Sequence, residues 1–370
     1  MLEIPTEVCA AYGVYPAPPA QIPSLINRTF VAHGPAGRFI LQRLHATFGA
    51  EVNLDLEAVT GHLLQQGFET PTLIRTQHGE PWLKDAQGHI WRALSFVAGR
   101  VIHAVEHPDQ ARSAAALLAR FHRAVADWDY AFRHVRTAAH DTAKHLQRLR
   151  EVQARAEQQR DLEVSALATA ILDASQHIRV DYSSLPRRIT HGDLKISNIL
   201  FWEDRPHEAR CLIDLDTLGY QYIAYELGDA LRSWCNPHGE AAAQPTVDLD
   251  IYQAALSGYA SAATDANAMG AGAIHAFDRL RPRELPLRPP RFLTVDEVTS
   301  IVEGLETICL ELSSRFAIDA LEDRYFGWDE HRFSSRREHN LVRAAGQLAL
   351  FSAVHRQRDT LLRIAHDAIA

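Results

Sequence analysis

The first hundred residues alternate short apolar runs with turn residues, a pattern typical of an antiparallel sheet. These runs predict strands at 25–31, 38–44, 73–76, 81–83 and 90–97. A helical pattern over 54–66, ended by Gly67, interrupts them. The proline-rich stretch 1–23 is predicted to be irregular. We therefore expect a small sheet-based N-terminal lobe over residues 1–98, with its boundary near Gly99.

Beyond Gly99 the apolar positions recur at helical spacing, so residues 99–370 are predicted to form a larger, mostly helical lobe. Helices are expected at 108–125, 137–159, 162–178, from 228 onward, from 294 onward and at 341–369. The pattern at Thr294 and Glu297 is that of a capping box. The basic, proline-punctuated stretch within 262–292 is interpreted as a surface connection. The fold class is α+β.

Composition narrows the class of protein. The chain has 370 residues, 46% hydrophobic and 23% charged, with a net charge of −8 and no evident basic patch. A general nucleic-acid binder is not expected from such a balance. Cys9, Cys211, Cys235 and Cys309 are widely spaced, which favours free thiols and a cytoplasmic location. No signal-peptide pattern opens the chain, and no apolar run is long enough for a membrane span.

The chemistry concentrates between residues 189 and 217. His191, Gly192, Asp193 and Asn198 form the pattern H-G-D-x-x-x-x-N, and a second apolar run ends in Asp214 and Asp216. Phosphoryl transfer from ATP needs a base for the acceptor hydroxyl and ligands for magnesium ions. Asp193 is the candidate base. Asn198 and Asp214 are the candidate metal ligands, with Asp216 assisting. Lys195 is placed to stabilise charge on the transferred group.

These segments resemble the aminoglycoside phosphotransferase and choline kinase group, whose members share the protein-kinase fold. Within that group the chain looks most like the N-acetylhexosamine 1-kinases, through the segments 26–31, 38–42, 52–54 and 338–343. The resemblance implies ATP and Mg2+ bound between a small β-rich lobe and a larger helical lobe. It also implies an amino-sugar substrate.

The resemblance extends to the nucleotide site of the first lobe. No glycine-rich phosphate loop is present, and the position of the usual strand lysine is taken by Gln42 or Arg43, with Arg43 expected to face the opposite side. The candidate nucleotide-binding residues are Asn27, Thr29, Gln42, Glu57, Ser95, Phe96 and Val97. For Asn27, Thr29 and Glu57 an ordinary solvated surface position is the alternative interpretation.

The resemblance also implies a substrate site in the second lobe, built from Asp193, Thr217, Arg315, Asp323 and Tyr325. His191 and Asp229 are expected to support the catalytic loop. For the face of Glu311, Arg315 and Asp319 the alternative is a set of ion pairs on a solvated helix. His140 and His145 are interpreted as exposed histidines that bind no metal.

The leading hypothesis is an ATP-dependent kinase that phosphorylates the anomeric 1-hydroxyl of N-acetylglucosamine or N-acetylgalactosamine. One alternative is a kinase of an aminoglycoside, choline, homoserine or another sugar. Another is an inactive nucleotide-binding regulator, suggested by the missing strand lysine. A small-molecule substrate is the expected partner, with no nucleic acid or membrane, and the chain is expected to be a monomer or homodimer.

Overall fold

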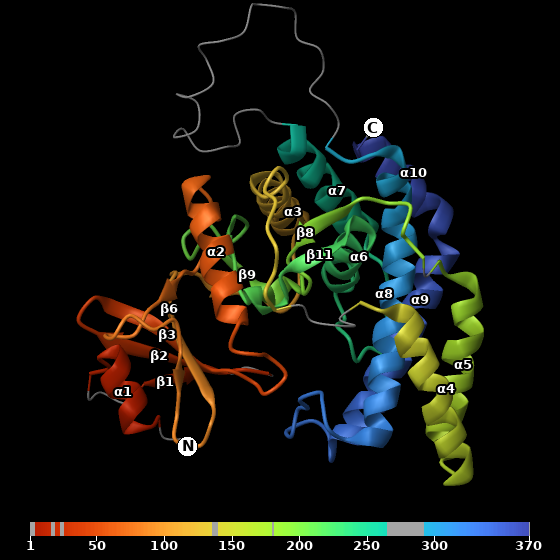
Figure 1. The fold of residues 1–370 in the computed structure, drawn as a ribbon. Helices are drawn as coiled ribbons and strands as arrows, with labels where there is room; N and C mark the ends of the chain where they lie inside the picture. Colours follow the sequence, from red (N-terminus) through yellow and green to blue (C-terminus); the bar gives the residue numbers. More distant parts are fainter. Residues whose placement is uncertain are drawn as a thin grey trace, which may run out of the picture. The chain divides into compact units, whose positions relative to one another are not determined.

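The computed structural model describes residues 4–15, 19–22, 26–134, 140–179, 181–264 and 292–369. The chain forms two compact units, and Figure 1 shows their elements in chain order. The first unit is Met1–Ala98 with Trp128–Val135, and the second is Gly99–Asp127 with Arg136–Ala370. The segment 128–135 therefore groups with the first unit, whereas the sequence pattern assigned it to the larger lobe.

An antiparallel sheet is the basis of the first unit, with strand order β1-β2-β3-β6-β4 and β5 paired to β6. The strands are β1 (Ala20–Ile22), β2 (Arg28–Gly34), β3 (Gly37–Arg43), β4 (Leu73–Ile74), β5 (Leu83–Lys84) and β6 (Ile90–Ser95). The register places Gln42 opposite Thr29 on β2 and opposite Arg92 on β6. Directly opposite residues share a face of the sheet, so these three side chains meet.

Helix α1 (Thr6–Tyr12) packs on this sheet. Val8 and Tyr12 are buried in one cluster with sheet residues, namely Phe30, Phe39, Leu41 and Trp91. The prediction of irregular structure over 1–23 is wrong for α1 and for β1. A seven-residue helix is too short to show a clear period, and the prolines flank it rather than interrupt it.

Helix α2 (Val52–Gln65) holds the segment 128–134 within the first unit. The carboxylate of Asp55 accepts hydrogen bonds from the Tyr130 hydroxyl at 2.8 Å and from the backbone N–H of His134 at 2.7 Å. The rings of His62 and Trp128 stack with centroids 4.3 Å apart. A buried carboxylate and one aromatic stack thus fix a segment that sequence periodicity does not predict.

The second unit is mostly helical, as predicted. Its helices are α3 (Pro108–Ala124), α4 (Thr142–Gln158), α5 (Leu162–Ala174), α6 (Ile223–Trp234), α7 (Leu249–Thr264), α8 (Val295–Glu322), α9 (Arg336–Arg356) and α10 (Arg358–Ile369), with short 3-10 turns η1 (Ser175–His177), η2 (Ile196–Asn198) and η3 (Leu215–Thr217). Helices α4 and α5 lie side by side along α8, and α3 packs on α7 (Figure 1).

Two small sheets carry the motif segments of the second unit. Strands β9 (Ile199–Phe201) and β10 (Ala209–Leu212) form the predicted hairpin, and β7 (Arg100–Val101) pairs with β9. Strand β8 (Arg187–Thr190) pairs with β11 (Gly219–Tyr222). The backbone N–H of Ile213 donates to the carbonyl of Asn198 at 2.9 Å. This bond holds the two motif segments together at the open end of the hairpin.

Two glycines set the position of α6 against α8. A Cβ added at Gly304 would lie 1.9 Å from the Ala224 carbonyl oxygen, and one at Gly228 would lie 2.6 Å from the Gly304 backbone. These distances are far inside van der Waals contact, so only glycine permits the helices to approach this closely. The close packing brings α6 to the segment that follows β8.

Several helix predictions are confirmed and two are wrong. The capping box at Thr294 is present, and Leu146, Leu149 and Val152 are the buried face of α4. Helix α6, however, begins at Ile223 rather than at Gly228. The sequence pattern hides this start, because the buried acidic residues Glu226 and Asp229 interrupt the apolar positions. The predicted helix 341–369 is two helices, since α9 ends at Arg356 and α10 begins at Arg358.

Further predictions concern the thiols, membrane spans and the basic stretch. All four cysteines are free, and Cys211 and Cys309 are buried as expected. Among the described helices, none combines the length and apolar character needed to cross a lipid bilayer. Most of the surface connection predicted at 262–292 lies outside the described residues.

Candidate active site

The segment between β8 and β9 places a carboxylate beside an ammonium group. The Lys195 Nζ lies 3.1 Å from an oxygen of Asp193, and about 30% of each side chain is exposed (32% and 28%). The side-chain nitrogen of Asn198 donates to the Asp193 carbonyl at 2.8 Å and to its carboxylate at 3.2 Å. Asp193 is therefore oriented by neighbours yet open on one side to a small reactant.

The local charges keep both groups ionised. Burial alone would raise the pKa of Asp193, but the charge and hydrogen bond of Lys195 outweigh it and hold the pKa below its ordinary value. The carboxylate of Asp193 correspondingly raises the pKa of Lys195 against the opposite effect of burial. A carboxylate in this state can accept a hydrogen bond from a hydroxyl group, and an ammonium in this state can attract phosphate oxygens.

Asp214 combines an unusual backbone with a crowded charge environment. It lies just after β10 with φ 62° and ψ 54°, a left-handed conformation that side chains with a Cβ seldom adopt. Its pKa is raised to about 6, by desolvation first and then by the negative charges of Asp216 and Asp193. Such a strained carboxylate among like charges is typical of a functional site.

The donor set here fits a hard divalent cation. Asp214 and Asp216 offer carboxylate oxygens, and the nitrogen of Asn198 is already used as a donor, so its amide oxygen is the atom it can offer to a cation. Oxygen-only ligands of this kind suit Mg2+. A bound cation would also favour the ionised form of Asp214, which its neighbours now oppose.

One face of α6 hydrogen-bonds the candidate catalytic loop, residues 191–198, from behind. Glu226 accepts from the backbone N–H of His191 at 2.8 Å and of Gly192 at 3.0 Å. Asp229 accepts from Leu194 N–H at 2.9 Å while its other oxygen binds Arg232. Further along the helix, the side chains of Ser233 and Trp234 bond the backbone of residues 196 and 194. These positions recur at helical spacing, so a single helix face fixes the loop.

Glu226 is the residue of this site that sequence reasoning missed. It is 2% exposed and also lies 3.2 Å from the Nε2 of His122, whose Nδ1 faces the Tyr259 hydroxyl at 2.9 Å. Burial would raise its pKa, but the hydrogen bond and charge of His122 lower it below its ordinary value. The only available signal was an acidic residue inside an apolar helical run, three positions before Asp229.

At Gly192 the loop turns in close contact with the backbone of Thr217. Gly192 has φ +80°, and an added Cβ would lie 2.5 Å from the Thr217 carbonyl oxygen. The Thr217 hydroxyl donates to the His191 carbonyl at 2.7 Å, and the His191 Nε2 faces the Ile213 carbonyl at 2.9 Å. The Thr217 side chain thus holds the loop backbone, although the resemblance assigned it to the substrate, and the His191 ring holds the segment just after β10.

His140 links the catalytic loop to α8. Its Nδ1 lies 3.0 Å from a Glu311 oxygen, its Nε2 lies 3.2 Å from the Gly192 carbonyl, and its ring stacks on Tyr225. Both partners only accept hydrogen bonds, so both ring nitrogens must carry protons and the imidazole is cationic. Burial opposes this charge, but Glu311 raises the pKa of His140 above its ordinary value. The expectation of an exposed histidine is wrong here.

The face of α8 that carries Glu311, Arg315 and Asp319 is largely buried. Glu311 is 0% and Asp319 is 3% exposed, so the alternative of a solvated helix face is wrong. Arg315 lies 3.9 Å from Glu311, and its guanidinium group stands 5.9 Å from the ring centroid of Tyr325 and 5.5 Å from that of Phe326. The Arg315 guanidinium, a planar donor, and the rings of Tyr325 and Phe326 therefore lie together near Glu311, the residue that His140 contacts.

Asp319 builds the turn that carries Tyr325. Its carboxylate accepts from the backbone N–H of Arg324, Tyr325 and Phe326 at 3.0, 2.8 and 2.9 Å, and from the Asn340 side chain at 2.9 Å. Asp323, the predicted substrate ligand, has φ 50° at the end of α8 and forms an ion pair with Arg336 at 3.1 Å. The Asp323 side chain is exposed.

The candidate nucleotide residues of the first unit have partners within that unit. The Gln42 oxygen accepts from two nitrogens of buried Arg92 at 2.9 and 2.7 Å, and its nitrogen donates to Thr29 at 3.1 Å. Glu57 pairs with Arg75 at 2.6 Å. The remaining contacts are Asn27 with the His45 N–H at 2.9 Å, Ser95 with Thr72 at 2.8 Å and Phe96 beneath Arg38 at 4.2 Å. Arg92 was not among the predicted site residues.

The model of the phosphotransferase enzyme family known as APH matches residues 20–263, which include every part of the catalytic loop described above. The chain belongs to this phosphotransferase family. Membership accounts for the H-G-D-x-x-x-x-N segment and for the Asp214 that follows β10, and it establishes a small-molecule kinase of the aminoglycoside phosphotransferase and choline kinase type.

Several solved structures share the fold of this chain. An amicoumacin kinase in complex with AMP-PNP, Ca2+ and Ami has a TM-score of 0.60 at 12% identity, covering 93% of this chain and 91% of that one. A microcompartment-associated aminopropanol kinase gives 0.57 at 14%, covering 97% and 98%. Choline kinase from Cryptosporidium parvum Iowa II gives 0.54 at 11%, covering 96% and 95%. At these identities the likeness confirms the α+β kinase-like fold alone.

Proposed function

We propose that this phosphotransferase is an ATP-dependent kinase of the anomeric 1-hydroxyl of an N-acetylhexosamine. The single observation that carries the choice of substrate is the pairing of Arg315 with the ring of Tyr325 on the same buried network as Gly192, next to Asp193. Sugar sites combine planar hydrogen-bond donors with an aromatic surface, because ring hydroxyls face the donors and ring C–H groups face the aromatic side chain.

In this proposal the oxygen of the sugar 1-hydroxyl bonds to the γ-phosphorus of ATP while Asp193 accepts the hydroxyl proton. The bond between the γ-phosphorus and the bridging oxygen breaks, and ADP leaves. An anomeric hydroxyl is more acidic than an ordinary alcohol, so a carboxylate of low pKa is an adequate base. Lys195 beside it supplies positive charge to the phosphoryl oxygens. Asn198 keeps Asp193 oriented through the hydrogen bond from its side-chain nitrogen.

Asn198, Asp214 and Asp216 are the residues that would hold Mg2+ in this proposal. The bound ion neutralises phosphate charge during transfer. The strained backbone of Asp214 and its raised pKa support this role, because like-charged carboxylates are stabilised when a cation shares them. Asp229 and Glu226 act from behind by holding the loop backbone, and the His191 ring holds the Ile213 carbonyl just before Asp214.

The nucleotide contacts remain part of the proposal. Asn27, Thr29 and the backbone of 95–97 are the groups we assign to ATP, with Gln42 acting indirectly by holding Arg92. In this proposal Arg92, which lies opposite Gln42 on β6, takes the place of the strand lysine. The ion pair between Glu57 and Arg75 fits the absence of a strand lysine, since Arg75 supplies the positive charge beside this glutamate.

A kinase of an amine-bearing alcohol is the second candidate. It is favoured by the aminopropanol and choline kinases with the same fold. Such a substrate needs carboxylates open to its cation, whereas Glu311 and Asp319 are buried and bonded internally. We therefore rank it below the amino sugar.

A coupled ADP-release assay with ATP and Mg2+ separates these candidates. The panel is N-acetylglucosamine, N-acetylgalactosamine, glucose, galactose, choline, homoserine and kanamycin. The proposal expects turnover on an N-acetylhexosamine with loss of the sugar's reducing end, and a much higher KM for Arg315→Met. Turnover on choline or kanamycin alone would reject the sugar site. ATP binding without turnover on any compound would favour an inactive regulator.

A further inference from the structure

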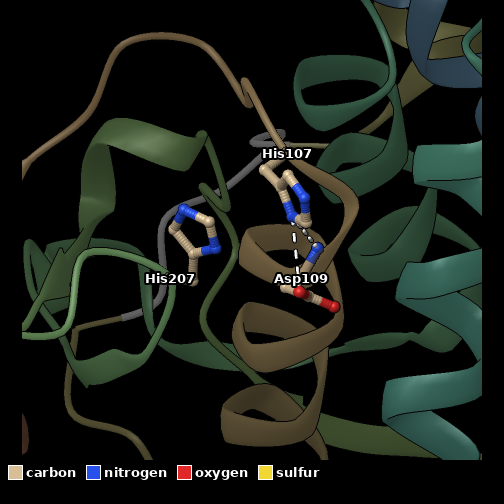
Figure 2. A group of neighbouring side chains, drawn as sticks. All are labelled: His107, Asp109 and His207. Atoms are coloured by element: carbon tan, nitrogen blue, oxygen red, sulfur yellow. Dashed lines mark hydrogen bonds and ion pairs between the residues drawn. The ribbon is translucent and has the colours of Figure 1, made fainter.

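A second group of chemically active side chains gathers at the start of α3. His107 is the residue that caps α3, Asp109 lies in its first turn, and His207 lies in the turn that joins β9 to β10. Their ligand atoms all lie within 4.8 Å of one another, and all three side chains are exposed. Figure 2 shows them gathered between the hairpin turn and the helix. The phosphotransferase chemistry proposed above uses none of them.

The scaffold around this cluster is already fixed by other contacts. The Gln110 side-chain oxygen accepts from the backbone N–H of Glu106 and His107 at 2.8 and 3.2 Å, and its nitrogen donates to the Pro206 carbonyl at 3.4 Å. The Ser113 hydroxyl accepts from the Ala209 N–H at 2.9 Å. The backbone on both sides of His207 is therefore tied to α3, which places the three side chains on neighbouring, fixed segments.

The spacing within the cluster suits metal ligands. The His107 Nδ1 lies 3.4 Å from one oxygen of Asp109. Two atoms bound to one tetrahedral ion at about 2.0–2.1 Å lie about 3.4 Å apart. The other Asp109 oxygen lies 3.8 Å from Arg112, so the ion pair and the metal would use different oxygens. The His107 and His207 rings, with centroids 4.6 Å apart, bring a second imidazole to the same side.

The chemistry selects the class of ion. The His107 Nδ1 accepts the Asp109 backbone N–H at 3.2 Å, so its lone pair points to that N–H, and an ion bound at Nδ1 would replace this hydrogen bond. Two imidazoles and one carboxylate favour zinc, nickel, copper or cobalt over Mg2+, which takes oxygen ligands.

We propose that His107, Asp109 and His207 form a binding site for one divalent transition-metal ion of the zinc and nickel class, distinct from the carboxylate site at Asp214. The ion would join the β9–β10 turn to α3. Because that hairpin ends in Asn198 and Asp214, its stability bears on the geometry of the catalytic segments. The expected effect is a tighter hairpin and a higher melting temperature.

The test is a calorimetric titration of Zn2+ and of Ni2+ into tag-free, EDTA-stripped full-length protein, in buffer with excess Mg2+ to occupy oxygen-rich sites. One equivalent with micromolar affinity and a raised Tm is expected. His107→Asn removes the imidazole but keeps a residue that caps helices well. This variant and His207→Ala should each lose roughly tenfold or more in affinity. His103→Ala, an exposed histidine on the preceding loop, should bind as wild type.

The outcomes are separable from those of the kinase assay, because the readouts are heat and Tm rather than turnover. Absence of a one-equivalent phase in the wild-type protein would overturn the site. Equal affinity in the wild type, His107→Asn and His207→Ala would overturn it as well, since the ion would then bind elsewhere. Circular dichroism of each variant confirms that a lost phase does not reflect unfolding.

Discussion

Two polar networks, one in each unit, show different ways of holding a functional side chain. In the second unit, α6 bonds the backbone of 191–196, so Asp193 and Lys195 remain partly open. In the first unit, the Gln42 side chain itself is used to hold Arg92, which is 1% exposed. Where the backbone is held, the motif side chains stay available for chemistry. Where a side chain makes the holding contact, as Gln42 does, its hydrogen-bonding groups are already used. The Gln42 position is therefore structural first, and any effect it has on phosphate acts through Arg92.

The largest effect is expected from Asp193→Asn, which changes the partly exposed carboxylate of the second unit. The amide keeps the size of the carboxylate but cannot accept the proton, so turnover should fall on the order of 100- to 10,000-fold. The coupled ADP-release assay measures this change. Asp204→Asn, an exposed aspartate in the hairpin turn, is the control and should keep wild-type turnover. Near-normal activity in Asp193→Asn would reject Asp193 as the base.

The anchoring side is tested by Glu226→Gln. The substitution leaves His122 with a weakened partner and exchanges charged for neutral hydrogen bonds to His191 and Gly192. Removing the charge from a buried acceptor of these hydrogen bonds should cost roughly 3 kcal/mol of unfolding free energy. Urea unfolding measures it, with exposed Glu163→Gln as the control.

The pH dependence of Glu226→Gln provides a second check. The folded-state pKa of Glu226 is lowered from its ordinary value of 4.5. Its contribution to stability is therefore present above about pH 4.5 and lost as the pH falls through the lower folded value. The gap between the wild type and Glu226→Gln should shrink in acid. A gap that stays constant from pH 7 to pH 3 would contradict an ionised, paired Glu226.

In the first unit the matching test is Gln42→Leu. It removes the oxygen that accepts two hydrogen bonds from Arg92 and leaves that buried guanidinium short of acceptors. We expect a loss of about 2 kcal/mol of unfolding free energy, the usual cost of leaving a buried charged donor unsatisfied. Gln65→Leu makes the same substitution at an exposed position of α2 and serves as the matched control. Unchanged stability would show that Gln42 does not hold Arg92.

The comparison also explains what the sequence could predict. Asp193, Asn198 and Asp214 could be proposed from the sequence because the motif residues lie close together along one chain segment and its hairpin. Glu226 and Arg92 were missed because their partners come from another helix or strand, and no local spacing marks such pairs. His140 was misjudged for the same reason. It looks like a surface histidine until α8 brings Glu311 to it.

The smallest effect is expected at His140, which connects Gly192 of the loop to Glu311 on α8. His140→Phe keeps a ring to stack on Tyr225 but removes the donor to Gly192 and the cation beside Glu311. Losing one charge-assisted hydrogen bond of about 1.5 kcal/mol would lower turnover roughly tenfold. The exposed His331→Phe is the control.

The sign of the pH effect follows from the groups around His140. Glu311 and Asp229 raise its pKa, whereas burial and Arg315 oppose them, and the folded value lies above the ordinary 6.5. The bridge is therefore intact below pH 6.5 and is lost as the pH rises through the folded value. Wild-type turnover should approach that of His140→Phe in alkaline buffer, and the ratio of the two should be largest near neutral pH. A ratio that stays flat from pH 6 to pH 10 would mean that the cation at His140 does not position the loop, and that Gly192 is held by Glu226 and Thr217 alone.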